Sequence, residues 1–202
     1  MGKISLTMME RLPAYLNYLE TARDNNIKNI SATKIAKDMR LGEVLVRKEL
    51  SKMSGNGRPH LGYVVNDLIN DIEKFIDTNQ NTKAVIIGAG KLGRALMGYP
   101  GFRKFGVDVI AAFDSDLDKI DSVTIHNISN LKKFVADNDV KIGIITVPKD
   151  NADEAYDLLI SSKIRAVWNF APVTLKPVSN VLVKNENLAV SLSYLNMLLK
   201  AK

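Results

Sequence analysis

The feature that most constrains this chain is an apolar run that ends in closely spaced glycines. AVIIGAGKLGRAL places Gly88, Gly90 and Gly93 in the G-x-G-x-x-G spacing, directly after a predicted strand and at the start of a predicted helix. There the first glycine allows a tight turn, the second lets a pyrophosphate approach the backbone, and the third lets the helix pack close to the sheet. The phosphates would meet free amides at the positive end of the helix. The predicted phosphate-binding residues are Gly88, Ala89, Gly90, Lys91, Leu92 and Gly93.

An acidic residue ends the next predicted strand. VDVIAAFD finishes at Asp114, somewhat beyond the usual spacing of about 20 residues from such a glycine motif. A carboxylate there accepts hydrogen bonds from ribose hydroxyls and repels a 2′-phosphate, and Asp116 adds to that repulsion. The expected cofactor is therefore NAD(H) rather than NADP(H). Two alternatives stay open: glycines that serve only packing, and a related domain that holds coenzyme A or another nucleotide.

Further continuous Val/Ile runs follow Lys83 and alternate with helical segments, which is typical of a parallel sheet covered by helices on both faces. Ligands of such sheets lie outside the carboxyl ends of the strands. The run IGIITV ends near Thr146, Val147 and Pro148, and another run ends near Asn169, so these residues are predicted to line a nicotinamide pocket. For Asn169, a side chain that only satisfies its own turn is an equal alternative.

The first half of the chain follows a helical pattern instead. Leu12, Tyr15, Leu16 and Leu19 recur at the spacing of one helical face. Pro13 is expected in a first turn, where its missing N–H is harmless. This segment is therefore predicted to be an amphipathic helix that packs on a core.

Two shorter helices and a glycine-rich excursion come next. Ser31 is expected to cap the helix of SATKIAKDM, and Gly42 lies in the turn before the helix EVLVRKELSKM. Two short helices joined by a tight, glycine-containing turn form the helix-turn-helix pattern. SGNGRPHLGYVV is predicted to form a wing, and residues 66–76 one more amphipathic helix. The second short helix is expected to bury Val44 or Leu45, Val46, Leu50 and Met53.

The charge is concentrated in this helical region. The formal net charge is +6, and between Lys28 and His60 eight basic residues face three acidic ones, an excess of five. A basic balance favours an anionic partner without identifying it. No run approaches the roughly 18 apolar residues of a membrane span, and the N-terminus lacks the layout of a secretory signal. Cysteine is absent, so no thiolate metal site is expected, and these features together favour the cytoplasm.

The organisation predicted from these patterns is α/β. An N-terminal winged helix-turn-helix domain covers residues 1–78, and a Rossmann-like parallel sheet that binds NAD(H) covers 79–184. The polar segment DTNQNTK, residues 77–83, is the best linker in the chain. Residues 185–202 form a C-terminal amphipathic helix, whose apolar face carries Leu188, Leu192, Leu195 and Leu199.

Residues suited to acid–base catalysis are scarce. Hydride-transfer enzymes usually place a proton donor or acceptor beside the reacting carbon. His60 falls in the predicted wing, and His126 falls in a loop after the predicted strand SVTI. Little chain is left for a substrate domain, so a binding role is favoured over catalysis. A small NAD-dependent oxidoreductase with a helical appendage is the alternative.

At this point several motifs match a known family in their order along the chain. They are RLPAYLNYLE, ISATKIAKDM, VRKELS, LGY, IIGAGKLGRALMGYPGF, AAFD, TVP, WNFAP and NENLAVSL. Through them the whole chain resembles the redox-sensing transcriptional repressor family Rex. The resemblance implies a homodimer with a swapped C-terminal helix, bound to a palindromic operator on double-stranded DNA. It also implies repression while NAD⁺ prevails and release when NADH binds.

The resemblance assigns DNA-contacting residues. Arg47 and Lys48 match the basic pair of the recognition helix, expected to contact base edges or phosphates in the major groove. Ser51 and Lys52 follow on the same helix. Arg58 in the wing would reach the minor groove or the backbone.

The resemblance also assigns a switch network of Arg11, Tyr99 and Asn187, with Tyr99 close to the nicotinamide. Here the chain departs from the family, because Asn187 stands in NENL where the family has aspartate. A neutral amide neither pairs with Arg11 as a carboxylate would nor attracts the positive nicotinamide of NAD⁺. We therefore expect the difference in affinity between NAD⁺ and NADH to be weakened or to depend on other residues. Lys91 is a second departure, because it replaces an asparagine of the family and adds attraction for a pyrophosphate.

Overall fold

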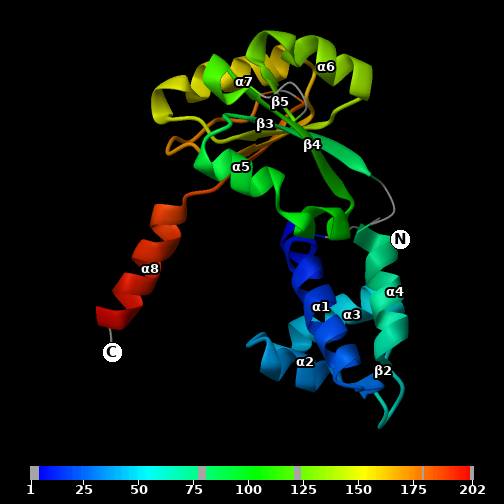
Figure 1. The fold of residues 1–202 in the computed structure, drawn as a ribbon. Coiled ribbons are helices and arrows are strands. Elements are labelled where there is room, and N and C mark those ends of the chain that lie inside the picture. The colour runs from blue at the N-terminus through cyan, green and yellow to red at the C-terminus, as the bar shows by residue number, and fades with distance from the viewer. Residues whose placement is uncertain (1–4, 77–80, 121–123, 179, 201–202) are drawn as a thin grey trace. The chain divides into compact units, whose positions relative to one another are not determined.

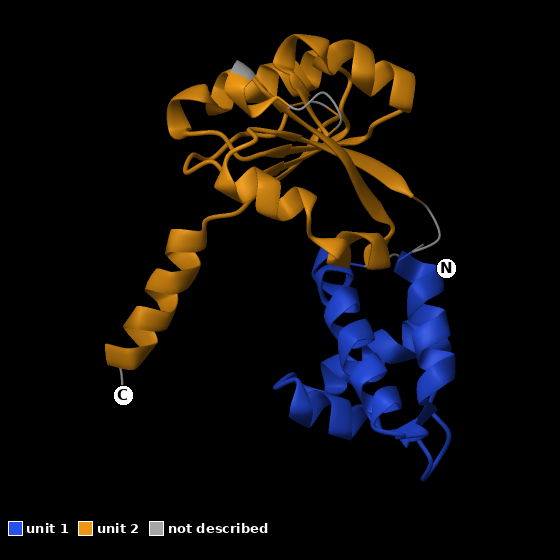
Figure 2. Cartoon of the chain, in the orientation of Figure 1, with its two compact units in different colours: residues 1–79 blue, residues 80–202 orange. Residues whose placement is uncertain are grey.

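A computed structural model describes residues 5–76, 81–120, 124–178 and 180–200 of the chain. The chain divides into two compact units, Met1–Asn79 and Gln80–Lys202 (Figure 2). The linker predicted at 77–83 has its first four residues outside the described ones. Each unit is considered below by itself.

The N-terminal unit consists of helices with a small two-stranded sheet. β1 pairs with β2 in an antiparallel manner, with Ile30 opposite Tyr63. After α3 the backbone of Arg58 and Gly62 exchanges two hydrogen bonds, which closes a tight turn at the tip of the wing. This order is that of a winged helix, and Figure 1 shows it in blue to cyan. The elements are α1 (Leu6–Asp24), β1 (Asn29–Ile30), α2 (Ala32–Asp38), α3 (Glu43–Ser54), β2 (Tyr63–Val64) and α4 (Val65–Ile76).

Local side chains fix where these helices begin. The Ser5 hydroxyl accepts a hydrogen bond from the Met8 amide at 3.2 Å, and the Ser31 hydroxyl accepts one from the Lys34 amide at 3.1 Å. The cap at Ser31 agrees with the sequence pattern. The prediction for Pro13 was wrong, because α1 begins at Leu6 and Pro13 lies inside the helix. The apolar face was read correctly there, but the cap at Ser5 was overlooked.

The buried face of α3 also differs from the prediction. Val44 is 70% exposed and Leu45 is 39% exposed, so neither belongs to the core. The buried residues of α3 are Val46, Glu49 and Leu50, which follow the three- and four-residue spacing of one helical face. A charged residue thus occupies a position where the sequence suggested only apolar ones.

The C-terminal unit is built on one parallel sheet. Its strand order is β5-β4-β3-β6-β7-β8, and every neighbouring pair is parallel. The first strand along the chain, β3, lies between β4 and β6, so the winding direction reverses beside it. This is the doubly wound Rossmann order, as predicted. The strands are β3 (Thr82–Ile87), β4 (Val107–Asp114), β5 (Ile125–Asn127), β6 (Ile142–Ile145), β7 (Ala166–Asn169) and β8 (Leu182–Asn185).

Helices cover the two faces of the sheet unequally. α6 and α7 cover one face, and α5 with the short η1 lies on the other (Figure 1). The larger apolar core lies under α6 and α7 and includes Phe113, Leu131 and Leu159. A smaller core around Ile86 and Ile144 lies on the other side. The helical segments are α5 (Lys91–Met97), η1 (Pro100–Phe105), η2 (Leu117–Lys119), η3 (Ile128–Asn130), α6 (Leu131–Asn138), η4 (Lys149–Asn151) and α7 (Ala152–Ser161).

His126 is placed differently from the prediction. It lies within β5 rather than in a loop after a strand, and residues 122 and 123 of the predicted strand SVTI lie outside the described ones. Its ring packs beside Phe113 and Phe134, with centroid separations of 5.6 and 5.2 Å. Aromatic packing therefore fixes this histidine.

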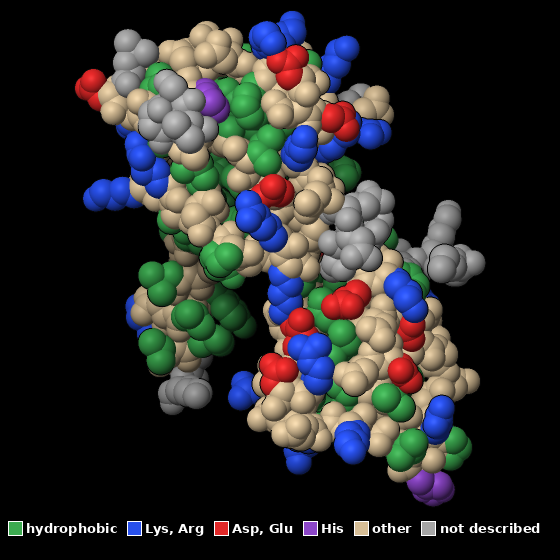
Figure 3. Space-filling model, turned by 45° about the vertical axis from the view of Figure 1, so that its right-hand side comes forward, with side chains coloured by type: hydrophobic (Ala, Val, Ile, Leu, Met, Phe, Trp, Pro, Cys, Tyr) green, Lys and Arg blue, Asp and Glu red, His purple; other side chains and the backbone are tan. Residues whose placement is uncertain are grey.

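The last helix, α8 (Leu188–Lys200), is exposed along its whole length within the described residues. Figure 3 shows hydrophobic side chains over this helix, in the lower left of the view. Its exposed large apolar residues are Leu188, Val190, Leu192, Tyr194, Leu195, Met197, Leu198 and Leu199. No helix in the described part of the chain is long and apolar enough to cross a membrane. The described residues also contain no cluster of His, Asp or Glu able to hold a metal ion.

Candidate functional site

A cavity of about 640 Å³ opens at the carboxyl ends of β3, β4 and β6. This is the point where the strand order reverses, the usual ligand position in an open parallel sheet. Its volume lies within the range of small-molecule sites. The residues predicted for the cofactor that line it are Gly88, Gly90, Asp114, Thr146, Val147 and Pro148.

The glycine turn is packed tightly against β6. Gly88 has φ +102°, and a methyl group on it would lie 3.0 Å from the Thr146 backbone. The Thr146 hydroxyl donates to the Gly88 carbonyl at 2.7 Å. A methyl group on Gly93 would lie 2.0 Å from the same carbonyl oxygen. Gly88 and Gly93 are therefore required by the protein's own packing, which fixes the turn at the mouth of the cavity.

Gly90 differs from the other two glycines. A methyl group on it would meet no protein atom within 4 Å, and its φ of −73° is open to any residue. Gly90 also lines the cavity. Nothing inside the protein demands a glycine here, so the free space beside Gly90 is available to a ligand that lies against the backbone.

Asp114 joins the glycine turn to the second strand. Its Oδ2 accepts a hydrogen bond from the Ala89 amide at 2.7 Å, and its Oδ1 accepts one from the Asp116 amide at 2.9 Å. The Lys119 ammonium lies 3.3 Å from both oxygens. Burial raises the pKa of Asp114, but these hydrogen bonds and the Lys119 charge outweigh it and hold that pKa below its ordinary value. The group is a carboxylate at neutral pH.

The other predicted cofactor residues do not line this cavity: Ala89, Lys91, Leu92, Gly93, Tyr99 and Asn169. Asn169 is fully buried, and its amide nitrogen donates to the Val173 carbonyl at 2.7 Å and to the Asn185 side chain at 2.9 Å. Its side-chain oxygen accepts from the Ala171 amide at 2.9 Å. These bonds favour the alternative that Asn169 satisfies its own turn.

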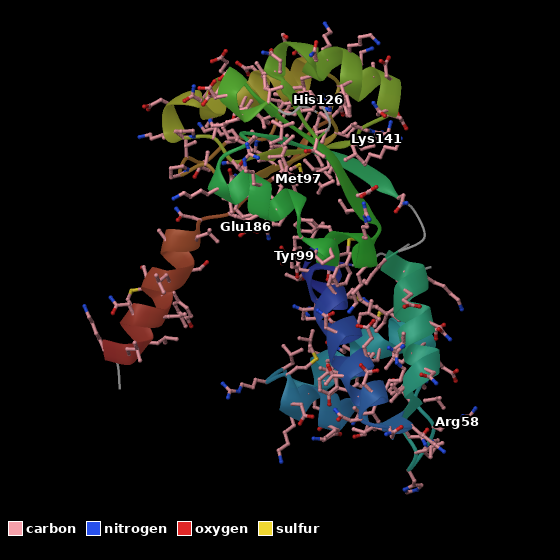
Figure 4. The ribbon with its side chains drawn as sticks, viewed as in Figure 1. Arg58, Met97, Tyr99, His126, Lys141 and Glu186 are labelled. Carbon is pink, nitrogen blue, oxygen red and sulfur yellow. The ribbon has the colours of Figure 1, made fainter. Side chains whose placement is uncertain are left out.

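Two residues of the predicted switch network lie in the C-terminal unit. Tyr99, labelled in Figure 4, is exposed at the start of η1, and its ring packs edge-on against Phe102 with centroids 5.0 Å apart. Asn187 is exposed, and its side-chain oxygen accepts a hydrogen bond from the Val190 amide at 3.1 Å. Asn187 therefore caps α8, a role that the sequence comparison did not suggest.

The third member, Arg11, has partners inside the N-terminal unit. Its Nε donates to Oε2 of Glu49 at 3.1 Å, and its Nη2 makes a second bond to Oε1. The Tyr15 hydroxyl donates to Oε2 of Glu49 at 2.7 Å. Burial raises the pKa of Glu49, but the Arg11 and Tyr15 bonds outweigh this and lower it below its ordinary value. Burial and the bond to Glu49 raise the pKa of Tyr15.

The predicted DNA-contacting residues lie on the outside of the N-terminal unit. Arg47, Lys48 and Lys52 are exposed on α3, and Arg47 forms an ion pair with Glu43 one turn earlier. Ser51 is half-buried, and its hydroxyl donates to the Lys48 carbonyl at 3.0 Å. Arg58 is exposed at the tip of the wing (Figure 4). The basic side chains Arg47, Lys48 and Lys52 are thus open to solvent, whereas Val46, Glu49 and Leu50 of the same helix are buried.

Part of the cavity was not predicted. Asp116 lines the cavity, and so does Lys119, which was overlooked although it lies three residues after Asp116. The far wall comes from α7, which is the next α-helix after β6 and could have been inferred from the βαβ order. The further lining residues that sequence reasoning missed include Ile128, Asn151, Glu154, Ala155 and Leu158.

A winged helix joined to a doubly wound sheet, with a glycine-rich cavity where the strand order reverses, defines a class of two-domain, nucleotide-responsive DNA-binding regulators. A family model described as "CoA binding domain" matches residues 79–173, and one described as "Putative DNA-binding protein N-terminus" matches residues 3–51. The redox-sensing transcriptional repressor Rex of Treponema denticola is 37% identical over 198 residues, 96% of this chain and 94% of that protein. The Rex protein of Clostridium acetobutylicum is 33% identical over 98% of this chain and 94% of its own length. The chain belongs to the Rex family of redox-sensing transcriptional repressors.

Solved structures agree with this assignment. A Rex-family repressor crystallised with β-NAD⁺ and operator DNA has a TM-score of 0.88 at 33% identity, covering all of this chain and 94% of that one. The same repressor with β-NADH has a TM-score of 0.87 at 32% identity, covering all of this chain and 96% of that one. Both domains of the fold therefore have counterparts in a single known structure.

Proposed function

We propose that this chain is a transcriptional repressor that senses the NADH/NAD⁺ balance and leaves its operator when NADH binds. The observation that carries the proposal is the cavity between the glycine turn and Asp114. The open backbone at Gly90 and the ionised carboxylate of Asp114 line the same cavity, and they are the kinds of group that bind a dinucleotide's phosphates and ribose. Residues 1–78 serve DNA binding, 79–184 cofactor binding and 185–202 dimer formation.

For the cofactor to act as a switch, NADH must bind the DNA-free arrangement better than the DNA-bound one. A shift of a two-state equilibrium from 1:99 to 99:1 needs about 5.5 kcal/mol of differential binding energy. Two cofactor sites in a dimer share that requirement. Since a ligand with equal affinity for both states shifts nothing, the affinity for NADH alone does not define the response.

The homodimer is supported by the uncovered apolar surfaces of the C-terminal unit. The large apolar residues of α8 are exposed, and a second surface remains open on the sheet face away from α6 and α7. That groove, of about 510 Å³, is lined by Phe102, Trp168 and Leu182 among others. Apolar patches of this extent are typical of interaction surfaces. A second copy of the chain, contributing its own α8, would cover them.

DNA binding is supported by the exposed basic residues of α3 and the wing. In a two-fold dimer the two recognition helices lie about one turn of DNA, or a multiple of it, apart, which matches a palindromic operator. Since operator DNA is the partner, we place the protein in the cytoplasm. A regulatory rather than catalytic role is supported by the relatives at 33–37% identity, which are named transcriptional repressors.

The decisive experiment is a titration of operator binding at a fixed, stated salt concentration, because phosphate contacts make affinity steeply salt-dependent. NADH should release the protein, and NAD⁺ should release it less or not at all. Coenzyme A must be titrated as well, because the matching family model is described as a CoA binding domain. Release by coenzyme A but not by NADH would replace this proposal with a coenzyme A sensor. NADH consumption with a carbonyl substrate would instead favour an oxidoreductase.

The dimer has its own test. Leu192→Glu with Leu195→Glu should convert the dimer to monomers in sedimentation, because both substitutions charge the exposed apolar face of α8. Ser193→Glu is the matched control on the same helix. The chain has a single tryptophan, Trp168, which lines the open groove, so its emission should shift to the red only in the leucine variants. An unchanged dimer in the double variant would contradict the proposed interface.

A further inference from the structure

Asp114 has no acceptor position left for a ribose. An ionised carboxylate offers about four lone-pair positions on two oxygens. Oδ2 accepts from the Ala89 amide and the Lys119 ammonium, and Oδ1 accepts from the Asp116 amide and the same ammonium. Every position is therefore filled before any ligand arrives.

The three donors differ in how easily they leave. The Ala89 amide belongs to the glycine turn, whose Ala89 carbonyl is also bound by Arg94 Nε at 3.0 Å. The Asp116 amide closes a short turn two residues from Asp114. Only Lys119 reaches Asp114 through a long side chain, which is 37% exposed. Ribose hydroxyls that bind Asp114 must therefore displace the Lys119 ammonium.

The displaced ammonium stays beside the ribose. The backbone of Lys119 is held by Arg94 Nη2, which donates to the Lys119 carbonyl at 3.2 Å. The Lys119 ammonium is also 3.3 Å from Asp116, a second and more exposed carboxylate. After displacement it keeps that partner. A positive charge therefore stays beside Asp116, near the position that a 2′-phosphate would occupy in a ribose site at the end of the second strand.

We propose that Lys119 is a specificity-determining residue of the cofactor site. It competes with the ribose of NAD(H) for Asp114, and it weakens the repulsion of a 2′-phosphate by Asp114 and Asp116. The inference rests on the proposed function, because it assumes a nicotinamide dinucleotide in the cavity. In a simple acidic ribose site a nearby lysine would affect both cofactors alike. Here removal of Lys119 should strengthen NAD(H) binding and weaken NADP(H) binding.

The test is calorimetric binding of NADH and NADPH to the full chain and to Lys119→Met. NADH should bind about two- to fivefold more tightly to the variant, the range expected when a partly exposed ion pair no longer competes. NADPH should bind about tenfold more weakly, because two unneutralised carboxylates then face its 2′-phosphate. Lys119→Arg keeps the charge and should bind NADPH nearly as the parent does. Lys133→Met, which removes the exposed Lys133–Asp137 pair on α6, is the matched control and should change neither affinity.

Weaker NADH binding by Lys119→Met, or an unchanged ratio of the two affinities, would overturn the inference while the proposed function stands. Loss of tightly packed structure is checked by the thermal melt of each variant. If the parent chain binds neither dinucleotide, the proposed function fails and this inference fails with it. Dinucleotide binding by the unmutated chain therefore distinguishes a failure of the Lys119 inference from a failure of the proposed function.

Discussion

Arg11 on α1 and Glu49 on α3 are joined by a pair of hydrogen bonds inside the N-terminal unit, one of them 3.1 Å long. Glu49 is 5% exposed and also accepts from the Tyr15 hydroxyl, so both of its carboxylate oxygens are bonded to α1. α3 presents Arg47 and Lys48 on its outer side. A buried ionic contact therefore holds the inner face of the helix that we propose contacts DNA.

Neutralising Glu49 should destabilise the N-terminal unit. Glu49→Gln removes the carboxylate and leaves the Arg11 guanidinium without its charged partner, at an expected cost of about 1–3 kcal/mol in unfolding free energy. Denaturant unfolding followed by far-ultraviolet circular dichroism measures it. Glu43→Gln, which removes only the exposed Glu43–Arg47 pair, should cost no more than about 0.5 kcal/mol. Equal losses in the two variants would argue against a structural role for the buried pair.

The same carboxylate predicts a dependence on pH. The pKa of Glu49 lies below its ordinary value of 4.5 in the folded protein, so its contribution is fully present above that value and is lost as the pH falls through the lower, folded pKa. The difference in unfolding free energy between the parent and Glu49→Gln should be constant near neutral pH and shrink below about pH 4.5. Denaturant titrations at several pH values measure this difference. If this difference in unfolding free energy grew as the pH fell, the folded pKa of Glu49 could not lie below its ordinary value.

Two glycines of the turn should separate folding from ligand binding. Gly93→Ala places a methyl group 2.0 Å from the Gly88 carbonyl, so it should lower the melting temperature as well as remove NADH binding. Gly90→Ala meets no protein atom, so its stability should stay within about 0.5 kcal/mol of the parent. Its NADH affinity should nevertheless fall at least tenfold, since the methyl group enters the ligand's space. Thermal melts and calorimetry distinguish the two, and unimpaired NADH binding by Gly90→Ala would argue against a pyrophosphate there.

Asn187 offers a clean test of the redox contrast. Asn187→Asp keeps a side chain able to cap α8, so the main change is one negative charge. If the network implied by the family resemblance operates here, the added charge should favour the positive nicotinamide of NAD⁺ by about three- to tenfold and leave NADH binding nearly constant. Both affinities are measured by calorimetry. Asn187→Ser keeps a neutral cap and serves as the control; an identical NAD⁺/NADH ratio in all three proteins would remove Asn187 from the switch.

Much of this architecture follows from local patterns. Continuous Val/Ile runs predicted the strands of the parallel sheet, because strands buried on both faces do not alternate apolar with polar residues. The glycine spacing located the turn at Gly88, since a positive φ and close backbone contact leave little choice of residue. The serine at position 31 marked a helix start for an equally local reason.

What the sequence did not disclose depends on contacts between distant segments. Glu49 is charged and looks like a surface residue until Arg11, 38 positions away, is placed beside it. Val44 and Leu45 fit an apolar face by composition, but the face of α3 that is buried is set by its packing against α2 and α4. Lys119 and the wall from α7 enter the cavity only because the sheet brings the ends of β4 and β6 together. For Asn169 the sequence left a pocket-lining role and a turn-satisfying role equally open, and only its bonds to Val173 and Asn185 distinguish them.

The double engagement of Asp114 restricts how this protein can change over evolution. Since the same carboxylate secures the Ala89 amide and is proposed to bind the ribose, a mutation at Asp114 should alter the shape of the glycine turn as well as cofactor choice. Lineages that acquire a preference for a phosphorylated cofactor should therefore retain this aspartate. Their substitutions should accumulate at the neighbouring positions 116 and 119, where charge can vary without disturbing the turn.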